Sequence, residues 1–449
     1  MYQQRPNISQ GKDWIMIWLY IAISVIGLVC IFSVEFREGD DFFRSLLAFK
    51  KNYSKQFYYL IACSVLATFI LLMDSKFFTA TPNLLYICGI LLMMATFVVG
   101  KNVNGSRSWI PLGFMNLQPV ETCKIFTALA LAKYISRPET NFSKSNTQMI
   151  ASGICFLPVV FSLLQNETGL ALVYFSFLLP MYREGFPPIY LIVGACLGFL
   201  LVASLLFSTT ELLIAITIIA LLAIYFMHRK IKRNKNILLT IVGIWCFSLL
   251  FVGLAVPMLF KHVFQKYQAD RIFSMVGRDN PYANEKTEGN TVEINTTKKP
   301  SKDKENYNVK QSKIAIGSGG FWGKGFLKGT QTQGEFVPEQ HTDFIFTSLG
   351  ESFGFVGSTI LMLLYLFLLL RIVMIAERQR STFSRVYAYS VAAIIFFHVA
   401  VNICMTIGLA PVIGITLPLM SYGGSSLFTF TILIFILIKL DMDRQMVLR

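Results

Sequence analysis

The sequence predicts an all-α, polytopic integral membrane protein with about ten to twelve transmembrane helices and one long extracytoplasmic loop. Of its 449 residues, 54% are hydrophobic and only 14% are charged, which is less charge than a water-soluble protein of this length carries. Apolar stretches of about 17–25 residues, each long enough to cross a hydrocarbon core of about 30 Å, recur along the whole chain. Both observations point to repeated membrane crossings.

Nine of the predicted spans precede the long loop. The first, 14–34, is longer than the core of a signal peptide and lacks a small-residue cleavage site, so we expect it to be retained. The turns at 165–167 and 208–210 are so short that the spans on either side of each must be antiparallel neighbours. The nine spans are 14–34, 57–73, 84–100, 119–136, 149–164, 168–182, 188–207, 211–227 and 237–260.

The loop at 261–343 separates this N-terminal part, 1–260, from a C-terminal part at 344–449. Its middle is polar, mixed in charge and poor in apolar residues, so the sequence predicts a disordered insert at 281–306. The following stretch, 311–336, alternates apolar residues with Gly and Ser. We expect it to lie on the membrane surface and to form a groove.

Three spans follow the loop, at 344–371, 386–408 and 425–441. As one helix, the first would be about 42 Å long, so its start would reach the outer membrane–water boundary. The stretch "IGLAPVIGITLPLMSYGGSS", 407–426, is broken by Gly and Pro yet carries no charge. Irregular backbone at membrane depth has to be buried in protein or line a cavity, and we expect here a re-entrant wall opposite the active face.

The distribution of Lys and Arg predicts that both termini are cytoplasmic. Basic residues gather in "HRKIKRNK" at 228–235 and in the loop after the tenth span, whereas those of the 35–56 loop are largely balanced by acidic ones. The long loop then faces outward. The net charge of +15 fits this topology and attraction to anionic lipid, and it does not imply nucleic acid.

Ionisable groups in or beside membrane spans are costly, so each is a candidate functional residue. Glu121 and Lys124 are three residues apart on one helical face. They either neutralise each other or form a cavity wall whose lysine meets a phosphate. Glu167 lies in a turn too short to leave the membrane region, as a solvated turn residue or a cavity carboxylate.

A second group of candidates lies at the predicted outer face. Arg107 suits bidentate contact with a pyrophosphate, and Trp109 beside it is an interfacial anchor or a binding residue. Asp343 stands where a lipid head group would lie, as a helix N-cap or as a base, with His341 supporting it. Glu351, two turns into the helix, faces protein or a cavity.

Six stretches together resemble the SEDS (shape, elongation, division, sporulation) family of bacterial cell-wall glycosyltransferases, and they cover most of the chain. They are "SRSWIPLG", "QPVETCK", "QSKIAIGSGG", "PEQHTDFIF", "GESFGF" and "LMSYGGSS". The stretch "GFWGKGFLKGTQTQGEFVPEQHTDF" resembles the rod-elongation branch (RodA-like) rather than the division branch (FtsW-like). The family usually has Gln-Pro-Asp-x-Gly where this chain has "QNETG" at 165–169, and most members have ten spans.

The resemblance implies a peptidoglycan glycosyltransferase. Such an enzyme polymerises lipid II, the undecaprenyl-diphosphate disaccharide-pentapeptide, on the outer face of the cytoplasmic membrane during cell elongation. It implies that Asp343 is essential, and a general base in reach of the acceptor sugar hydroxyl suits this role. The positions that correspond to family residues and would bind the diphosphate are Arg107, Lys124, Arg271 and Lys313.

The resemblance also implies cofactors and partners. A divalent cation, Mg²⁺ or Mn²⁺, would assist, although no ligand cluster in the sequence identifies its site, and no organic cofactor is expected. The expected partners are a class B penicillin-binding protein transpeptidase and other membrane proteins of the elongation complex. Two alternatives stay open: a lipid II flippase or ion-coupled transporter, in which broken helices and buried charge pairs also occur, and a scaffold that activates a transpeptidase.

Overall fold

The computed structural model describes residues 11–37, 42–103, 106–113, 115–263, 273 and 302–444. The chain divides into two compact units, Met1–Pro187 with Asn308–Arg449, and Pro188–Tyr307. This division differs from the expected one at 260 and 343. The predicted site residue Arg271 and most of the predicted insert at 281–306 lie outside the described residues.

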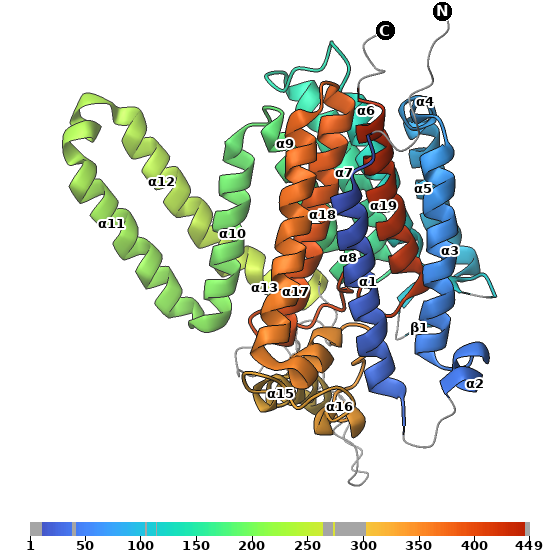
Figure 1. Cartoon of the computed structure of the whole chain (residues 1–449). Coiled ribbons are helices and arrows are strands. Elements are labelled where there is room, and N and C mark those ends of the chain that lie inside the picture. The colour runs from blue at the N-terminus through green and yellow to red at the C-terminus, as the bar shows by residue number, and fades with distance from the viewer. Residues whose placement is uncertain are drawn as a thin grey trace, which may run out of the picture. The chain divides into compact units, whose positions relative to one another are not determined.

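The first unit is a bundle of long helices with short elements at its ends (Figure 1). Its long helices are α1 (Trp14–Glu35), α3 (Asn52–Leu72), α5 (Pro82–Val99), α6 (Pro119–Ile135), α7 (Ser145–Leu164), α15 (Lys302–Ser318), α17 (Ile345–Arg378), α18 (Thr382–Thr406) and α19 (Gly424–Met442). Its short ones are α2 (Phe42–Leu47), α4 (Ser75–Ala80), α8 (Thr168–Val173), α9 (Leu178–Arg183) and α16 (Thr330–Gln333), with a 3-10 turn at Tyr174–Phe177.

The core of this unit forms around α18 and α19, which contact α17, α6 and α3. α19 is apolar all round and buried along most of its length, as expected of a helix surrounded by other helices. α1 comes close enough to the chain before α19 that a Cβ on Gly27 would lie 2.6 Å from the Met420 Cα. Only a glycine permits that approach.

A small antiparallel sheet follows α5. It consists of β1 (Lys101–Val103), β2 (Ser106–Pro111) and β3 (Asn116–Leu117), in that order. Lys101 pairs with Trp109, and Ile110 pairs with Leu117. The sheet holds the predicted Arg107 loop in a defined conformation.

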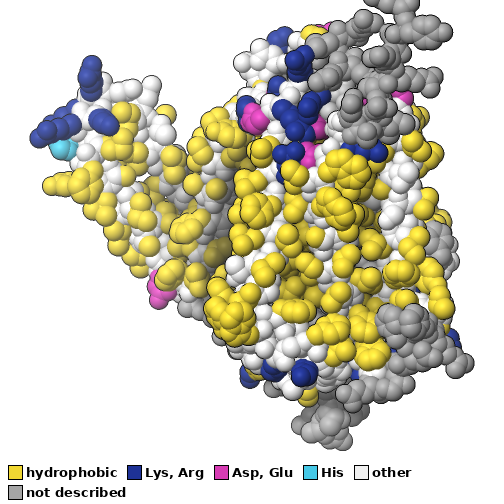
Figure 2. Space-filling view, in the orientation of Figure 1, with side chains coloured by type: hydrophobic (Ala, Val, Ile, Leu, Met, Phe, Trp, Pro, Cys, Tyr) yellow, Lys and Arg dark blue, Asp and Glu magenta, His cyan; other side chains and the backbone are white. Residues whose placement is uncertain are grey.

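The second unit contains α10 (Pro188–Leu206), α11 (Thr209–Arg233), α12 (Lys235–Leu250) and α13 (Val256–Met258), the last flanked by π-helical turns at Phe251–Ala255 and Leu259–Val263. Its core is small, with Ala203, Leu212 and Val252 buried together. Only 6% of the apolar window of α11 is buried, so its hydrophobic side chains face outward along most of the helix. Lys and Arg gather at one end of this unit (Figure 2).

The prediction of a polytopic all-α membrane protein is confirmed. Within the described part of the chain, nine helices are long and apolar enough to cross a membrane. Each of the twelve predicted spans falls on a helix or a series of helical turns, and those at 119–136, 168–182 and 188–207, which fall on α6, α8 to α9 and α10, are not among these nine. In Figure 2, hydrophobic side chains cover the middle of the visible face of the first unit and charged ones gather toward its ends.

One sequence expectation is wrong: residues 344–371 are not one straight helix. α17 is broken at Gly354, whose backbone has φ 62° and ψ −155°. The loop before α16 binds to this break, since the Phe355 N–H donates to the Gly320 carbonyl at 2.9 Å and the Val356 N–H to that of Phe321 at 3.1 Å. A Cβ on Gly354 would lie 2.4 Å from the Gly323 nitrogen, so a glycine is required.

At the other end of α17, an ionic cluster joins three helices. The guanidinium of Arg378 donates to Asp13 at 3.0 Å and to Asp441 at 2.9 Å, and Arg371 donates to Asp13 at 2.9 Å. The start of α1, the end of α17 and the end of α19 therefore meet at one end of the first unit. The topology expected from the Lys and Arg distribution requires this arrangement.

Candidate active site

Asp343 stands on a backbone that is fixed at three consecutive carbonyls. The His341 carbonyl accepts from the Tyr422 N–H at 2.8 Å, and the Thr342 carbonyl accepts from the Ser421 hydroxyl at 2.7 Å. The Asp343 carbonyl accepts from the Asn402 side-chain amide at 2.8 Å. These hydrogen bonds fix the backbone from which the carboxylate extends, and a reacting group requires such a fixed base.

The Asp343 carboxylate lies against the irregular segment 411–418. A Cβ on Gly414, which has φ +75°, would lie 3.3 Å from the Asp343 Oδ2. The segment was expected to be a wall opposite the active face, and instead it lies directly beside this aspartate. The N-cap of α17 is Phe344, so Asp343 is not the helix cap considered as its alternative role.

His341 contacts Tyr422 with its backbone and its ring. The imidazole lies 5.7 Å, centroid to centroid, from the ring of Tyr422, whose N–H binds the His341 carbonyl. The supporting role expected of the His341 side chain stays a prediction.

Lys313 reaches the same region from α15. Its side chain lies on Gly408, where a Cβ would be 2.5 Å from the lysine Nζ. The preceding Ser312 fixes the helix, because its hydroxyl is 2.6 Å from that of Thr347 and donates to the Thr406 carbonyl at 2.8 Å. α15 thus presents an exposed lysine beside the ends of α17 and α18.

Glu351 is fully buried and binds protein rather than an open cavity. Its carboxylate accepts from Lys324 Nζ at 2.7 Å, from the Gln331 N–H at 2.9 Å and from the Thr332 N–H at 2.7 Å. Since these donors come from the loop and from α16, Glu351 attaches that segment to the tip of α17.

Glu121 and Lys124 are both buried, with 2% and 0% of their surface exposed. Lys124 Nζ lies 3.8 Å from Glu121 and 2.8 Å from Nε2 of His398, and it also lies 5.4 Å from the ring centroid of Phe430. A lysine so enclosed does not reach a substrate phosphate in this conformation. His398 was not predicted, because a single histidine in an apolar helix gives no spacing signal.

Arg107 and Trp109 lie on β2, Arg107 exposed and Trp109 partly buried. Glu167 accepts hydrogen bonds from the hydroxyls on either side of Arg107, at 2.8 Å from Ser106 and 2.5 Å from Ser108. Glu167 therefore fixes the Arg107 loop, an observation that neither sequence alternative anticipated.

The predicted site residues fall into linked groups. Asp343, His341 and Lys313 lie where α15, α17 and the segment after α18 meet, and Lys124 connects to Asp343 through side chains of α18. In the ranges that the structure describes, no three His, Cys, Asp or Glu residues form a group that could hold a metal ion. The divalent cation therefore stays a prediction.

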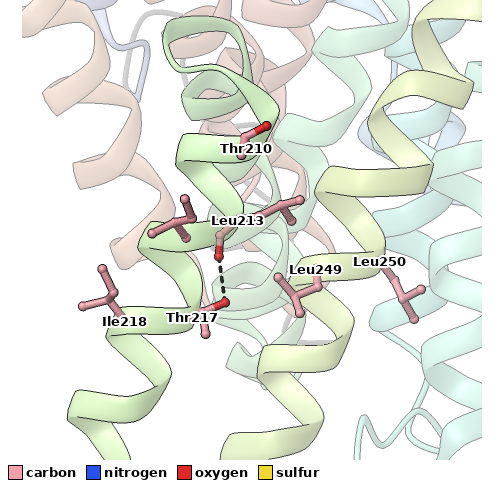
Figure 3. A pocket seen from close by; sticks show the side chains of 7 residues that line it. Thr210, Leu213, Thr217, Ile218, Leu249 and Leu250 are labelled. Atoms are coloured by element: carbon pink, nitrogen blue, oxygen red, sulfur yellow. Dashed lines mark hydrogen bonds between the residues drawn. The ribbon is translucent and has the colours of Figure 1, made fainter.

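An open apolar groove lies within the second unit (Figure 3). It has a volume of about 510 Å³ and is lined by Thr210, Leu213, Ile214, Thr217, Ile218, Leu249 and Leu250. Between its lining residues, the Thr217 hydroxyl donates to the Leu213 carbonyl at 2.8 Å, as the dashed line in Figure 3 shows. None of the candidate residues lines it.

Comparison with known proteins gives relatives over nearly the whole chain. Peptidoglycan glycosyltransferase MrdB of Escherichia coli (strain K12) is 31% identical over 362 residues, covering 81% of this chain and 78% of the relative. Peptidoglycan glycosyltransferase RodA of Treponema pallidum (strain Nichols) is 28% identical over 443 residues, covering 93% and 94%.

Solved structures share the fold. A chain of a peptidoglycan synthase complex matches with a TM-score of 0.66 and 24% identity, covering 97% of this chain and 99% of the other. The rod shape determining protein RodA of Thermus thermophilus matches with a TM-score of 0.60 and 22% identity, covering 98% and 99%. The sequence profile of the FtsW/RodA/SpoVE cell cycle proteins matches residues 13–235 and 209–446. The chain therefore belongs to the FtsW/RodA/SpoVE family of cell cycle proteins.

Proposed function

We propose that this chain is a peptidoglycan glycosyltransferase that polymerises lipid II into glycan strands during cell elongation. Relatives that are peptidoglycan glycosyltransferases, MrdB and RodA, support the reaction class. One observation carries the assignment of the site: the Asp343 carboxylate stands on three anchored carbonyls at the end of α17 opposite the ionic cluster.

The reaction requires a base at this place. The 4-hydroxyl oxygen of the acceptor sugar bonds to the anomeric carbon of the donor, and the bond from that carbon to the lipid diphosphate breaks. Asp343 takes the hydroxyl proton, a contribution of about 10²- to 10⁴-fold to the rate. Because the donor linkage is α and the product linkage is β, attack is in line and inverts the anomeric carbon.

The leaving diphosphate gains negative charge, which cations stabilise. Lys313 and Arg107 are exposed and suit this role, whereas buried Lys124 does not. Arg271 remains a candidate outside the described residues. A divalent ion, Mg²⁺ or Mn²⁺, would add charge stabilisation at the diphosphate, whose own oxygens are suitable ligands.

The proposed location is the bacterial cytoplasmic membrane, with both termini in the cytoplasm. The ionic cluster supports this topology, because it brings the ends of α1 and α19 together with the arginines that precede α18. Asp343, at the opposite end of α17, then lies at the outer face, where lipid II is used.

The test is polymerisation of fluorescent lipid II by the purified protein in detergent. We expect Asp343→Asn to abolish polymer, because an amide cannot take the proton, while the variant still inserts and folds. Glu339→Gln, a neighbouring exposed carboxylate, is the matched control and should retain near wild-type activity.

The same assay separates the alternative functions, since transport has no meaning in detergent. A flippase or a scaffold would give no polymer even from the wild-type chain. Polymer made by Asp343→Asn at the wild-type rate would contradict the role of this aspartate while leaving the glycosyltransferase in place.

We also propose a class B penicillin-binding protein as partner. The structural similarity to a chain of a peptidoglycan synthase complex supports this. Co-purification from membranes that contain both proteins is the measurement, and we expect a complex that survives mild detergent. Recovery of this chain without any transpeptidase, under conditions in which both are expressed, would contradict the proposal.

A further inference from the structure

Two side chains of α18 bind the irregular segment 411–418, which lies beside Asp343. His398 and Asn402 are four residues apart, so they lie one above the other on one face of the helix. The Nδ1 of His398 lies 3.1 Å from the Thr416 carbonyl, and the Asn402 amide donates to the Ile415 carbonyl at 2.6 Å. The same amide group binds the Asp343 carbonyl at 2.8 Å.

These contacts determine where the proton of His398 lies. A backbone carbonyl only accepts, so Nδ1 carries the hydrogen and donates it to Thr416. The other ring nitrogen, Nε2, then accepts from the Lys124 ammonium at 2.8 Å. A doubly protonated imidazole would place two donors against each other at this contact, and both residues are fully buried.

Lys124 has its partners inside the bundle. A buried ammonium is stabilised only when acceptors surround it, and here these are His398 on α18, Glu121 on its own helix and the ring face of Phe430 on α19. The contact therefore ties α6 to α18 at the level of His398. One turn farther along α18 is Asn402, the residue that binds the backbone of Asp343.

We propose that His398 and Asn402 are positioning residues for the Asp343 carboxylate, with Lys124 holding His398 in the Nδ1–H tautomer. His398 binds the Thr416 carbonyl, and Asn402 binds the carbonyls of Ile415 and Asp343. These hydrogen bonds hold the segment between α18 and α19 at a fixed position beside the carboxylate. The expected effect of these residues on kcat rests on the proposed function. The tautomer and the contacts stand without it.

Variants that keep one of the two hydrogen bonds of His398 test the proposal by their polymerisation kinetics. His398→Asn can still donate to the Thr416 carbonyl from the place of Nδ1, whereas His398→Gln can still accept from Lys124 at the place of Nε2. We expect Asn402→Leu to lower kcat for fluorescent lipid II polymerisation about 10- to 100-fold, the cost of a small misplacement of a reacting group, with KM nearly unchanged. His398→Phe should act in the same direction, and His398→Asn should restore most of the rate.

Ser390→Ala is the matched control. Ser390 is equally buried on α18, but its hydroxyl donates to the Val386 carbonyl of the same helix, at 2.8 Å, and binds no other helix among the described residues. We expect its kcat to equal that of the wild type. If Ser390→Ala loses as much activity as Asn402→Leu, or if His398→Asn is no better than His398→Phe, the polar residues of α18 act through general stability and the proposal is overturned.

A spectroscopic measurement keeps the proposal testable without activity. The chain has four histidines, so ¹⁵N-histidine labelling gives few signals in solid-state NMR, and the His398 signals are those lost in His398→Gln. We expect a protonated Nδ1 and an unprotonated, hydrogen-bonded Nε2 that shifts in Lys124→Met. An Nε2–H tautomer or an imidazolium would overturn the assignment. A correct tautomer in a protein that makes no polymer would instead contradict the proposed function.

Discussion

Gly408 determines the position of the Lys313 ammonium because it has no side chain. It has φ +75°, and a Cβ there would lie 2.3 Å from Cε and 2.5 Å from Nζ of Lys313. The backbone of the turn after α18 is therefore the surface on which the lysine side chain lies. Any larger residue would push the ammonium away from its position beside the Asp343 region.

We therefore expect Gly408→Ala to lower polymerisation about tenfold by displacing the Lys313 ammonium, a small movement of a charged group. The lysine end is flexible, so the fold should survive. The measurement is the initial rate on fluorescent lipid II beside Lys313→Met. Gly185→Ala is the control, because Gly185 also has positive φ, +102°, but no atom lies within 4 Å of its Cβ position. Equal losses in both variants would assign the effect to backbone strain.

The residue scale is also where the sequence was least informative. Asp343 and His341 could be singled out as candidates because they precede a predicted span, and Lys313 because its stretch resembles a family motif. Lys124 was correctly singled out as costly, but its partner His398 lies 274 residues away, on another helix. No local sequence pattern predicts such a pair, since the two residues meet only when α6 packs against α18.

At the scale of the element, the ionic cluster stabilises the end of the bundle opposite the site. Asp13 caps α1, its carboxylate accepting from the Met16 N–H at 3.1 Å, and it also binds Arg371 and Arg378. Burial by itself would raise the pKa of the Asp13 carboxyl, but Arg371, the Met16 N–H and Arg378 together hold this pKa below its ordinary value of 3.8.

We expect Asp13→Asn to lower the free energy of unfolding by about 1–3 kcal/mol, because two arginines lose a buried charged partner. The folded-state pKa is depressed, so the contribution of Asp13 is complete above its ordinary pKa and is lost only as the pH falls through the lowered value. Thermal unfolding in detergent should therefore show a constant difference from the wild type between pH 5 and pH 8 that shrinks in strong acid.

Asp74→Asn is the control for helix capping alone. Asp74 caps α4 by accepting from the Lys76 N–H at 2.9 Å and is exposed, and asparagine caps as well as aspartate does. The thermal unfolding of Asp74→Asn should therefore match that of the wild type. A difference between Asp13→Asn and the wild type that grows toward acid pH would contradict the assigned role of the carboxylate.

Elements were predictable where hydrophobicity and length sufficed. Spans such as 14–34 and 425–441 match α1 and α19 within a few residues, because a continuous apolar run leaves few alternatives. The surface segment expected at 311–336 instead includes the end of α15 and all of α16. Its glycines suggested an irregular chain, and only contacts with Glu351 and the Gly354 break give it order.

For the whole molecule, the sequence established the class and the approximate number of spans but not the grouping of helices. The division of the chain at Pro187 and Asn308 depends on contacts between distant segments, which composition does not report. Likewise, the segment at 411–418 was recognised as irregular and protein-facing. Its position beside Asp343 follows from Asn402, which binds both Ile415 and Asp343, and from Ser421, which binds both Leu417 and Thr342.

The break at Gly354 has a consequence for the enzyme in membranes of different thickness. Beyond it, residues 355–378 form a helix of about 36 Å, close to the hydrocarbon thickness of a bilayer. The tip at 345–353 is bonded to the loop and α16 instead of continuing that rod, so the depth of Asp343 is determined by protein contacts. A thicker or thinner bilayer would tilt the long part of α17 about the break.

Hydrophobic mismatch costs only fractions of a kcal/mol per ångström, and here the break keeps that cost away from the reacting groups. In vesicles whose phosphatidylcholine chains range from 16 to 20 carbons, we expect the polymerisation rate to vary by less than about threefold. A steep dependence on chain length would show that lipid elasticity reaches the site. Gly354 would then let the tilt of α17 change with bilayer thickness while the position of Asp343 stays the same.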